Sequence, residues 1–184
     1  VIPAYQRNYT WTANREVKQL MEDISSILSG ERTKHFLGIM IYLETSFSAF
    51  QRERSVIDGQ QRLTTIFLLM YALKELMLQK DMADDAEKLE KMYLVNQFGG
   101  SNKYKLKPLV SDDKVYQKSN VYLNFCYIRE RLGKMLEKYT FTEMLDAINK
   151  LYIVCVPIGK DDYPQNIFES INATGAKLTA SDLI

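Results

Sequence analysis

The sequence predicts an α+β domain, because short apolar runs of strand length alternate with longer segments in which apolar residues recur at helical spacing. The first strand candidate is apolar throughout, so it is expected at the centre of a sheet with the second as its neighbour. The third is expected to be buried and to end at Pro157. Strands are expected over residues 35–43, 54–57 and 152–156, and helices over residues 14–29, 63–77, 81–98, 120–138 and 142–149.

Single residues predict further details of the helices. Asn14 or Thr12 is expected to cap the first helix, and Gly30 is expected to end it. The inward faces of the third and fourth helices are expected to include Met92 and Val121 respectively, because both residues fall at the helical spacing of their apolar neighbours.

The length and net charge of the chain limit how many domains it can form and which partners its composition requires. A chain of 184 residues can bury a sizeable core, as one domain or as one domain with an appended helical subdomain. Lys and Arg number 24 against 23 Asp and Glu, so the net charge alone demands neither nucleic acid nor a membrane surface. No apolar run approaches the roughly 18 residues of a membrane span, and no signal peptide is visible. A cytoplasmic protein is expected.

The two cysteines and the chain ends lead to two more expectations. Cys126 and Cys155 lie in apolar surroundings and are expected to be buried free thiols. One His and two Cys are too few for a zinc cluster or a His-rich metal nuclease. Thr179 and Asp182 have the spacing of a capping box immediately before the chain stops, and the chain begins with Val, so it is expected to be cut at both ends.

The stretch over residues 55–77 is the centre of the functional interpretation. It is expected to form a strand end, a polar loop from Asp58 to Arg62 and a long helix that is buried on most sides. Gly59 would let the backbone approach a ligand, and the first helical turn would offer N–H groups to a phosphate. Arg62 could grip that phosphate with its planar fork. The alternative is structural: Asp58 and Gln61 form a capping box, and Arg62 is an ion-pair partner.

Two residues outside this stretch each allow a functional and a structural interpretation. Arg7 lies among Tyr5, Tyr9 and Trp11 in an N-terminal edge strand or extended arm, and it is either a second anion contact or an exposed Arg stacked on an aromatic ring. His35 begins the first strand and is expected near the polar loop, as a ligand contact or as a hydrogen-bonded structural histidine.

Two further segments carry polar or basic groups. The loop at residues 172–175 (N-A-T-G) is a helix connector or a second binding loop, in which Asn172 and Thr174 would supply hydrogen bonds and Lys177 a charge. A short alternating strand places Lys103, Lys105 and Lys107 on one face, where they contact a phosphate backbone or are simply solvated.

Four stretches occur together and in a fixed order. They are residues 3–11 (P-x-Y-Q-R-x-Y-x-W), 35–38 (H-F-L-G), 57–65 (I-D-G-Q-Q-R-L-T-T) and 168–184 (F-E-x-I-N-x-T-G-x-x-L-T-x-x-D-L-I). The set closely resembles the N-terminal domain of GmrSD-type restriction endonucleases, a family marked by the D-G-Q-Q-R motif. The resemblance implies a ParB/sulfiredoxin-like mixed sheet with added helices, and a nucleotide-binding, NTP-hydrolysing module in prokaryotic defence against foreign, often modified, DNA.

The resemblance also implies a division of the whole protein. The core with the D-G-Q-Q-R loop is expected in residues 1–80, a mainly helical insertion or subdomain in 81–150, and a returning strand with the N-x-T-G loop in 151–184. Cutting would belong to a C-terminal or separate HNH-like nuclease domain, so this chain should not cut DNA alone. DNA is an expected partner of the full-length protein, and a homo-oligomer is left open.

The leading hypothesis is an NTPase module that uses a nucleoside triphosphate of unknown base and Mg²⁺. The catalytic candidates are Asp58, Gln60, Gln61 and Arg62, and Asp58 would hold Mg²⁺ directly or through water, or orient the attacking water. Contacts to the nucleotide are expected from Arg7, His35, Gly59, Arg62, Thr64, Asn172, Thr174 and Gly175. The alternatives are a module that recognises DNA or nucleotide without turnover, helped by Lys103, Lys105 and Lys107, and an assembly scaffold.

Overall fold

The computed structural model describes residues 9–47, 52–96, 104–106 and 119–159. Its sheet contains β1 (His35–Phe47), β2 (Arg52–Asp58) and β3 (Leu151–Ile158) in the order β2-β1-β3. β1 pairs antiparallel with β2 and parallel with β3, so the sheet is mixed and its long apolar strand is central. The predicted α+β class is confirmed, and so is the central position of β1.

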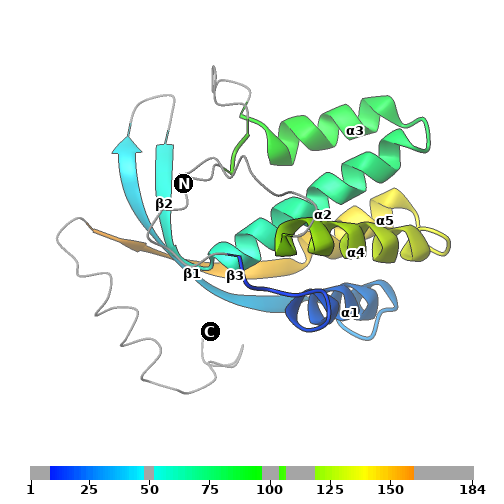
Figure 1. The fold of residues 1–184 in the computed structure, drawn as a ribbon, viewed down its shortest axis with the longest axis horizontal. Helices are drawn as coiled ribbons and strands as arrows, with labels where there is room; N and C mark the ends of the chain where they lie inside the picture. The colour runs from blue at the N-terminus through cyan, green and yellow to red at the C-terminus, as the bar shows by residue number, and fades with distance from the viewer. Residues whose placement is uncertain (1–8, 48–51, 97–103, 107–118, 160–184) are drawn as a thin grey trace.

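The helices pack together beside one end of the strands (Figure 1). They are α1 (Glu16–Leu28), α2 (Gln60–Leu78), α3 (Ala83–Leu89), the π-helix η1 (Glu90–Leu94), α4 (Asn120–Met135) and α5 (Phe141–Asn149). α2 packs against α3, η1 and α4, while α1 packs against α4 and α5. One cluster of buried apolar residues joins all of these helices, including those of the segment predicted as an insertion. Among the described residues, none of the helices combines the length and apolarity that crossing a bilayer requires.

The starts of α1 and α2 differ from the predicted ones. Gln60, Gln61 and Arg62 were expected in a loop but form the first turn of α2, because Gly59 turns the chain within one residue at φ 96°. The N-cap is Gly59 and no side chain caps the helix, so the predicted capping box of Asp58 and Gln61 is wrong. Side-chain capping of α1 is also wrong, because its N-cap is Arg15.

The start of α1 is stabilised from inside the helix instead. The Glu16 carboxylate accepts a hydrogen bond from the Thr12 backbone N–H at 3.2 Å, so neither Thr12 nor Asn14 acts as the side-chain cap. The other end of α1 follows the prediction: Ser29 is its C-cap, and Gly30 follows with φ 82°.

Two residues that were predicted to face inward are exposed. The helix predicted over residues 81–98 ends at Leu94 in the π-turn η1. A π-turn holds more residues than an α-turn, so the register shifts: Met92 is 62% exposed, while Leu94 is buried. On α4, Val121 lies in the first turn and is 36% exposed, whereas Asn124 is 1% exposed. The predicted inward positions of Met92 and Val121 are therefore wrong.

β3 is less buried than predicted. It lies at an edge of the described sheet, and among its residues only Ile158 is buried. Pro157 does not end the strand but pairs with Tyr42 inside it, because an edge strand tolerates the missing N–H. Cys155 on β3 and Cys126 on α4 are free thiols as predicted, but both are exposed. Their predicted burial is wrong.

Candidate functional site

The junction between β2 and α2 carries the D-G-Q-Q-R motif. Asp58 is the last residue of β2 and lies opposite Ile41 of β1. The Gln60 side-chain amide donates to the backbone carbonyls of Ile57 at 2.8 Å and Val56 at 3.3 Å. These bonds tie the first turn of α2 to the end of β2, so the position of the helix N-terminus relative to the sheet is fixed.

Gln61 ties the same turn to residues 9–11, the described part of the N-terminal arm, which is called the arm below. Its side-chain carbonyl accepts the backbone N–H groups of Thr10 at 2.8 Å and Trp11 at 3.4 Å. This glutamine therefore connects segments that are 50 residues or more apart in the chain. The arm consequently forms part of the junction rather than a loose end beside it.

A buried relay holds the arm from the other side. The Asn124 amide donates to the Tyr9 hydroxyl at 3.1 Å and to the Trp11 carbonyl at 2.8 Å. The Thr65 hydroxyl donates to the backbone carbonyl of Gln61 at 2.7 Å. The Thr65 hydroxyl oxygen therefore accepts the hydrogen bond from the Tyr9 hydroxyl, also at 2.7 Å. Burial raises the pKa of Tyr9, and the hydrogen bonds that its hydroxyl makes with Thr65 and Asn124 oppose this by lowering it. The relay runs from α4 through the arm to the first turn of α2.

Arg62 lies between two glycines on different segments. Its Nη1 donates to the Ile39 carbonyl of β1 at 2.5 Å. A Cβ atom at Gly38 would lie 3.2 Å from its Cζ, and one at Gly59 would lie 3.3 Å from its Nη1. Both glycines have positive φ, 111° and 96°, and the register of β1 against β3 shifts between Phe36 and Gly38. The backbone therefore leaves a cradle for the guanidinium.

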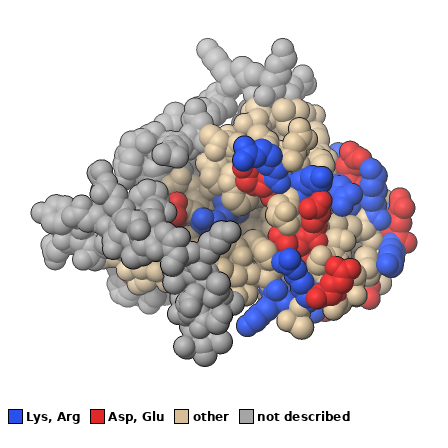
Figure 2. Space-filling model, turned by 90° about the horizontal axis from the view of Figure 1, so that it is seen from below, with Lys and Arg blue, Asp and Glu red and all other residues tan. Residues whose placement is uncertain are grey.

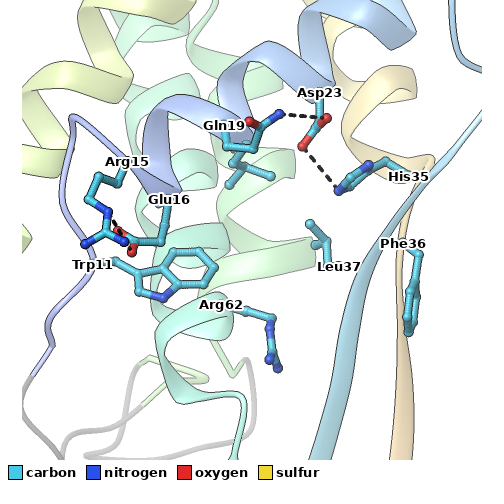
Figure 3. A pocket seen from close by; sticks show the side chains of 10 residues that line it. Trp11, Arg15, Glu16, Gln19, Asp23, His35, Phe36, Leu37 and Arg62 are labelled. Atoms are coloured by element: carbon cyan, nitrogen blue, oxygen red, sulfur yellow. Dashed lines mark hydrogen bonds and ion pairs between the residues drawn. The ribbon is translucent and has the colours of Figure 1, made fainter. Parts of the chain in front are cut away.

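Arg62 also lines a pocket of about 470 Å³ between the arm, α1, β1 and α2 (Figure 3). Figure 3 shows Trp11 and Arg62 toward one end of the pocket and Asp23 with His35 toward the other. The polar lining residues are Arg15, Glu16, Gln19, Asp23, His35 and Arg62, and the apolar ones are Trp11, Leu20, Phe36 and Leu37.

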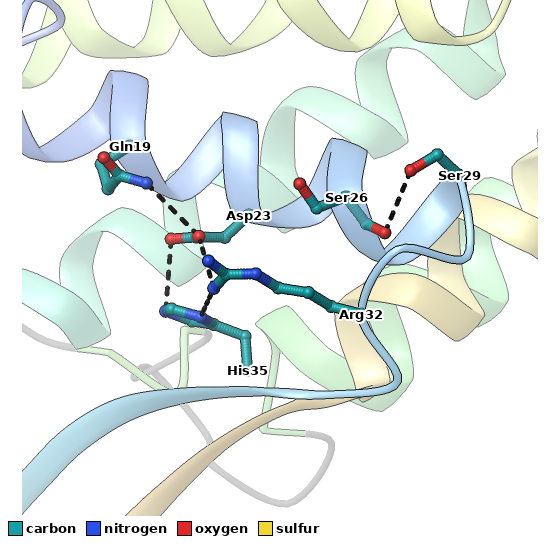
Figure 4. Close-up of polar contacts among 6 residues, drawn as sticks. All are labelled: Gln19, Asp23, Ser26, Ser29, Arg32 and His35. Carbon is teal, nitrogen blue, oxygen red and sulfur yellow. Dashed lines mark hydrogen bonds and ion pairs between the residues drawn. The ribbon is translucent and has the colours of Figure 1, made fainter. Parts of the chain in front are cut away.

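His35 and Asp23 form a polar cluster with Arg32 at the far end (Figure 4). Asp23 is 4% exposed, and its carboxylate lies 3.2 Å from His35 Nε2, 3.2 Å from Arg32 Nη1 and 3.4 Å from the Gln19 amide. Arg32 Nη1 is also 3.2 Å from His35 Nδ1. Since a guanidinium can only donate, Nδ1 accepts, and Nε2 donates to Asp23. Both ring nitrogens are engaged, so a ligand would meet His35 through its ring carbons.

Arg15 and Glu16 lie at the α1 side of the pocket. Arg15 is 81% exposed and is 3.9 Å from the Glu16 carboxylate. Backbone N–H groups of Glu16 itself and of Thr12 hydrogen-bond this carboxylate and lower the pKa of Glu16. The pocket therefore combines an ionised acceptor with the guanidinium donors of Arg15 and Arg62.

Over the visible face of the helical part, acidic and basic side chains are interspersed (Figure 2).

Of the predicted site residues that the structure describes, only His35 and Arg62 line this pocket. Thr64 is half-buried on α2. Lys105 is exposed in the turn after η1, where its backbone N–H bonds the Leu94 carbonyl at 2.8 Å and its ammonium group donates to the Met92 carbonyl. Outside the described residues lie Arg7, Lys103, Lys107, Asn172, Thr174, Gly175 and Lys177.

The N-terminus of α2 suits an anion. Its first turn carries no acidic residue and no side-chain cap, and it carries Arg62. Within the described ranges, no three His, Cys, Asp or Glu side chains are grouped to hold a metal ion.

The fold and the site define a small mixed α+β domain with an arginine-lined pocket at a strand-to-helix junction. The family model of the GmrSD restriction endonuclease N-terminal domain matches residues 1–184, and the chain belongs to this family. It is therefore part of a restriction-system protein. The comparison with curated proteins finds no match for the chain.

Several residues of the site were not assigned from the sequence. Trp11 and Gly38 stand in the motif stretches, yet neither was assigned to the site. Asp23 falls three residues after Leu20 and four before Ile27 on the buried face of α1, and an acid there signals a buried partner. Asn124 carries the same signal on α4, where it falls four residues before Ile128.

Proposed function

We propose that the chain is the nucleotide-binding and NTP-hydrolysing module of a prokaryotic, modification-dependent restriction protein that acts in the cytoplasm against foreign DNA. It would be coupled to an HNH-like nuclease domain outside this chain. The observation that carries the proposal is the cradled guanidinium of Arg62, at an uncapped helix N-terminus and on the wall of a pocket. Its size, about 470 Å³, lies within the usual range of small-ligand sites.

The residues of the junction would divide the work. Arg62 and the first-turn N–H groups of α2 would hold phosphate oxygens, since both offer donors to negative charge. Asp58 would hold Mg²⁺ or orient the attacking water, and Gln60 or Gln61 would position that water. The metal ion would neutralise charge on the phosphates. Because the Gln60 amide bonds β2 carbonyls and the Gln61 carbonyl bonds the arm, both side chains start from fixed positions.

Calorimetric titration of the full-length protein with ATP, GTP, CTP and UTP, with and without Mg²⁺, tests the proposal. Arg62→Ala should weaken binding by about 10- to 100-fold, because it removes charge-assisted hydrogen bonds. Arg62→Lys keeps the charge but loses the fork, and should give an intermediate affinity. Arg129→Ala is the matched control, since Arg129 is exposed on α4 and does not line the pocket.

Phosphate release in the same protein separates turnover from binding. Asp58→Asn should abolish Mg²⁺-dependent hydrolysis while leaving metal-free nucleotide binding, because the amide keeps the shape and loses the charge. Binding without turnover in the wild type would favour the alternative of recognition alone. If Arg62→Ala changed neither affinity nor hydrolysis, the assignment of the site would be wrong. DNA contact through Lys103, Lys105 and Lys107 stays a prediction.

A further inference from the structure

Trp11 is the residue of the arm that reaches the pocket. Its indole lines the pocket together with Arg62, and it also packs against the buried apolar cluster of the helices. Figure 3 shows the ring and the Arg62 side chain toward the same end of the pocket. A half-buried aromatic ring that is backed by the core offers a firm flat surface to a ligand.

The backbone of Trp11 is fixed at both of its polar groups. Its N–H donates to the Gln61 side-chain carbonyl at 3.4 Å, and its carbonyl accepts from the Asn124 amide at 2.8 Å. Because a carbonyl can only accept, the Asn124 atom that faces it must be the NH₂ group. The second N–H of the same amide goes to the Tyr9 hydroxyl at 3.1 Å. Both N–H groups of the Asn124 amide therefore donate to the arm.

Such an amide is costly to bury unless it is satisfied. Asn124 is 1% exposed at the N-terminal end of the buried face of α4, where a leucine would bury more apolar surface. A buried polar group without partners destabilises the folded state, so the hydrogen bonds of Asn124 to Tyr9 and Trp11 are required for the fold to tolerate it. Its placement sets where the arm, and with it the indole, lies against α2.

We propose that Trp11 stacks on the base of the bound nucleotide and that Asn124 is the residue that positions it. The inference rests on the proposed function, because it assigns the base end of the same pocket. Stacking on an aromatic side chain tolerates every base, so Trp11 would add affinity for a nucleoside without selecting among ATP, GTP, CTP and UTP. Arg62 would contribute through the phosphates, whether or not a base is attached.

A comparison of two ligands separates these contributions. Calorimetry on the full-length protein would measure the affinity for each nucleoside triphosphate and for inorganic tripolyphosphate, which has no base. Trp11→Leu should lower nucleotide affinity by about 5- to 100-fold and leave tripolyphosphate affinity unchanged. Trp11→Phe should recover most of the loss, because the aromatic face remains. Arg62→Ala should weaken both ligands.

Asn124→Ala tests the positioning role by the same ratio. It should lower nucleotide affinity more than tripolyphosphate affinity, as Trp11→Leu does. Ile128→Val is the control: Ile128 is fully buried one turn further along α4, so its truncation destabilises the fold without removing a hydrogen bond to Trp11. It should leave the ratio of the two affinities unchanged. Thermal unfolding of every variant would establish that the folded state is being compared.

The outcomes distinguish the two levels of the proposal. If wild-type protein binds nucleotide through Arg62 but Trp11→Leu binds it equally well, the stacking assignment is wrong and the proposed function stands. If Asn124→Ala weakens both ligands in proportion, its role is structural and the positioning claim is overturned. Wild-type protein that binds neither ligand would overturn the proposed function and the inference together.

Discussion

The guanidinium of Arg62 lies against the backbone of Gly38, so closely that a Cβ atom there would be 3.2 Å from Cζ, 3.3 Å from Nε and 3.4 Å from Nη2. The two residues come from different motif stretches and from different elements, α2 and β1. Because Gly38 has no side chain, it leaves room for the Arg62 guanidinium, which donates to the Ile39 carbonyl.

Gly38→Ala should destabilise the fold and displace Arg62. The strain of an L side chain at φ 111° is expected to cost about 1–3 kcal/mol, and contact with the guanidinium adds to it. Gly30→Ala is the matched control, because Gly30 has φ 82° but nothing within 4 Å of its Cβ position. Urea unfolding should show the larger loss for Gly38→Ala. Nucleotide affinity should fall only in that variant, and equal affinities in the two would contradict the cradle.

Gly133→Ala should stabilise the protein. Gly133 lies inside α4, its Cβ position has nothing within 4 Å, and its φ is not positive. Alanine gains up to about 1 kcal/mol over glycine in a helix interior. A rise in the free energy of unfolding supports this interpretation of α4, whereas a fall would show that the space beside Gly133 is filled.

Tyr9→Phe should change how stability depends on alkaline pH. Burial raises the pKa of Tyr9 above 10.0, so the native state holds this phenol proton more tightly than the unfolded chain does. Stability is then fully retained below the unfolded pKa and falls as pH rises through the folded one. Phenylalanine removes that part of the decline.

Urea unfolding near neutral pH and just above pH 10.0 measures the effect. The wild type should lose more stability between the two conditions than Tyr9→Phe. Tyr93→Phe is the control, because Tyr93 makes an exposed hydrogen bond to Asn149 at 3.3 Å. A Tyr9→Phe variant that declines as steeply as the wild type would mean that the Tyr9 hydroxyl is not buried in the relay.

Both cysteines should react with an aromatic disulfide reagent in the folded protein. Cys126 and Cys155 are exposed and free, so neither needs unfolding to be reached. Cys126→Ser and Cys155→Ser would assign the two reactions, and full denaturation gives the total thiol count. A thiol that reacts only after denaturation would show that this cysteine is buried, as its apolar neighbours in the sequence suggested.

Periodicity predicted the strands and most of the helices, because burial of an apolar face repeats along the chain. It could not predict where α2 begins, since the start depends on the backbone angle of Gly59. Nor could it predict the π-turn at η1, which moves Met92 to the surface without any change in composition. Local spacing also favoured a capping partner for Gln61, whereas the structure connects it to Thr10 and Trp11.

The sequence predicted some residues of the candidate site but not the contacts that these residues make. The sequence placed Arg62 at a helix N-terminus and His35 near it, and both line one pocket. The contacts of Arg62 with Gly38, of His35 with Asp23 and of Trp11 with Asn124 join residues that are 12 or more positions apart. Single polar contacts of that kind leave no period in a sequence. Their signal is a polar residue on an apolar face, which says that a partner exists without naming it.

Trp11 is the only tryptophan in the 184 residues and it lines the pocket, so its fluorescence reports on the site directly. The most direct measurement is a titration of this chain with each of the four nucleoside triphosphates while Trp11 emission is recorded, in the wild type and in Arg62→Ala. We expect a saturable change in emission that requires a much higher nucleotide concentration, or is lost, in Arg62→Ala. An emission that no nucleotide changes, or a change that is identical in Arg62→Ala, would contradict a nucleotide site at this pocket.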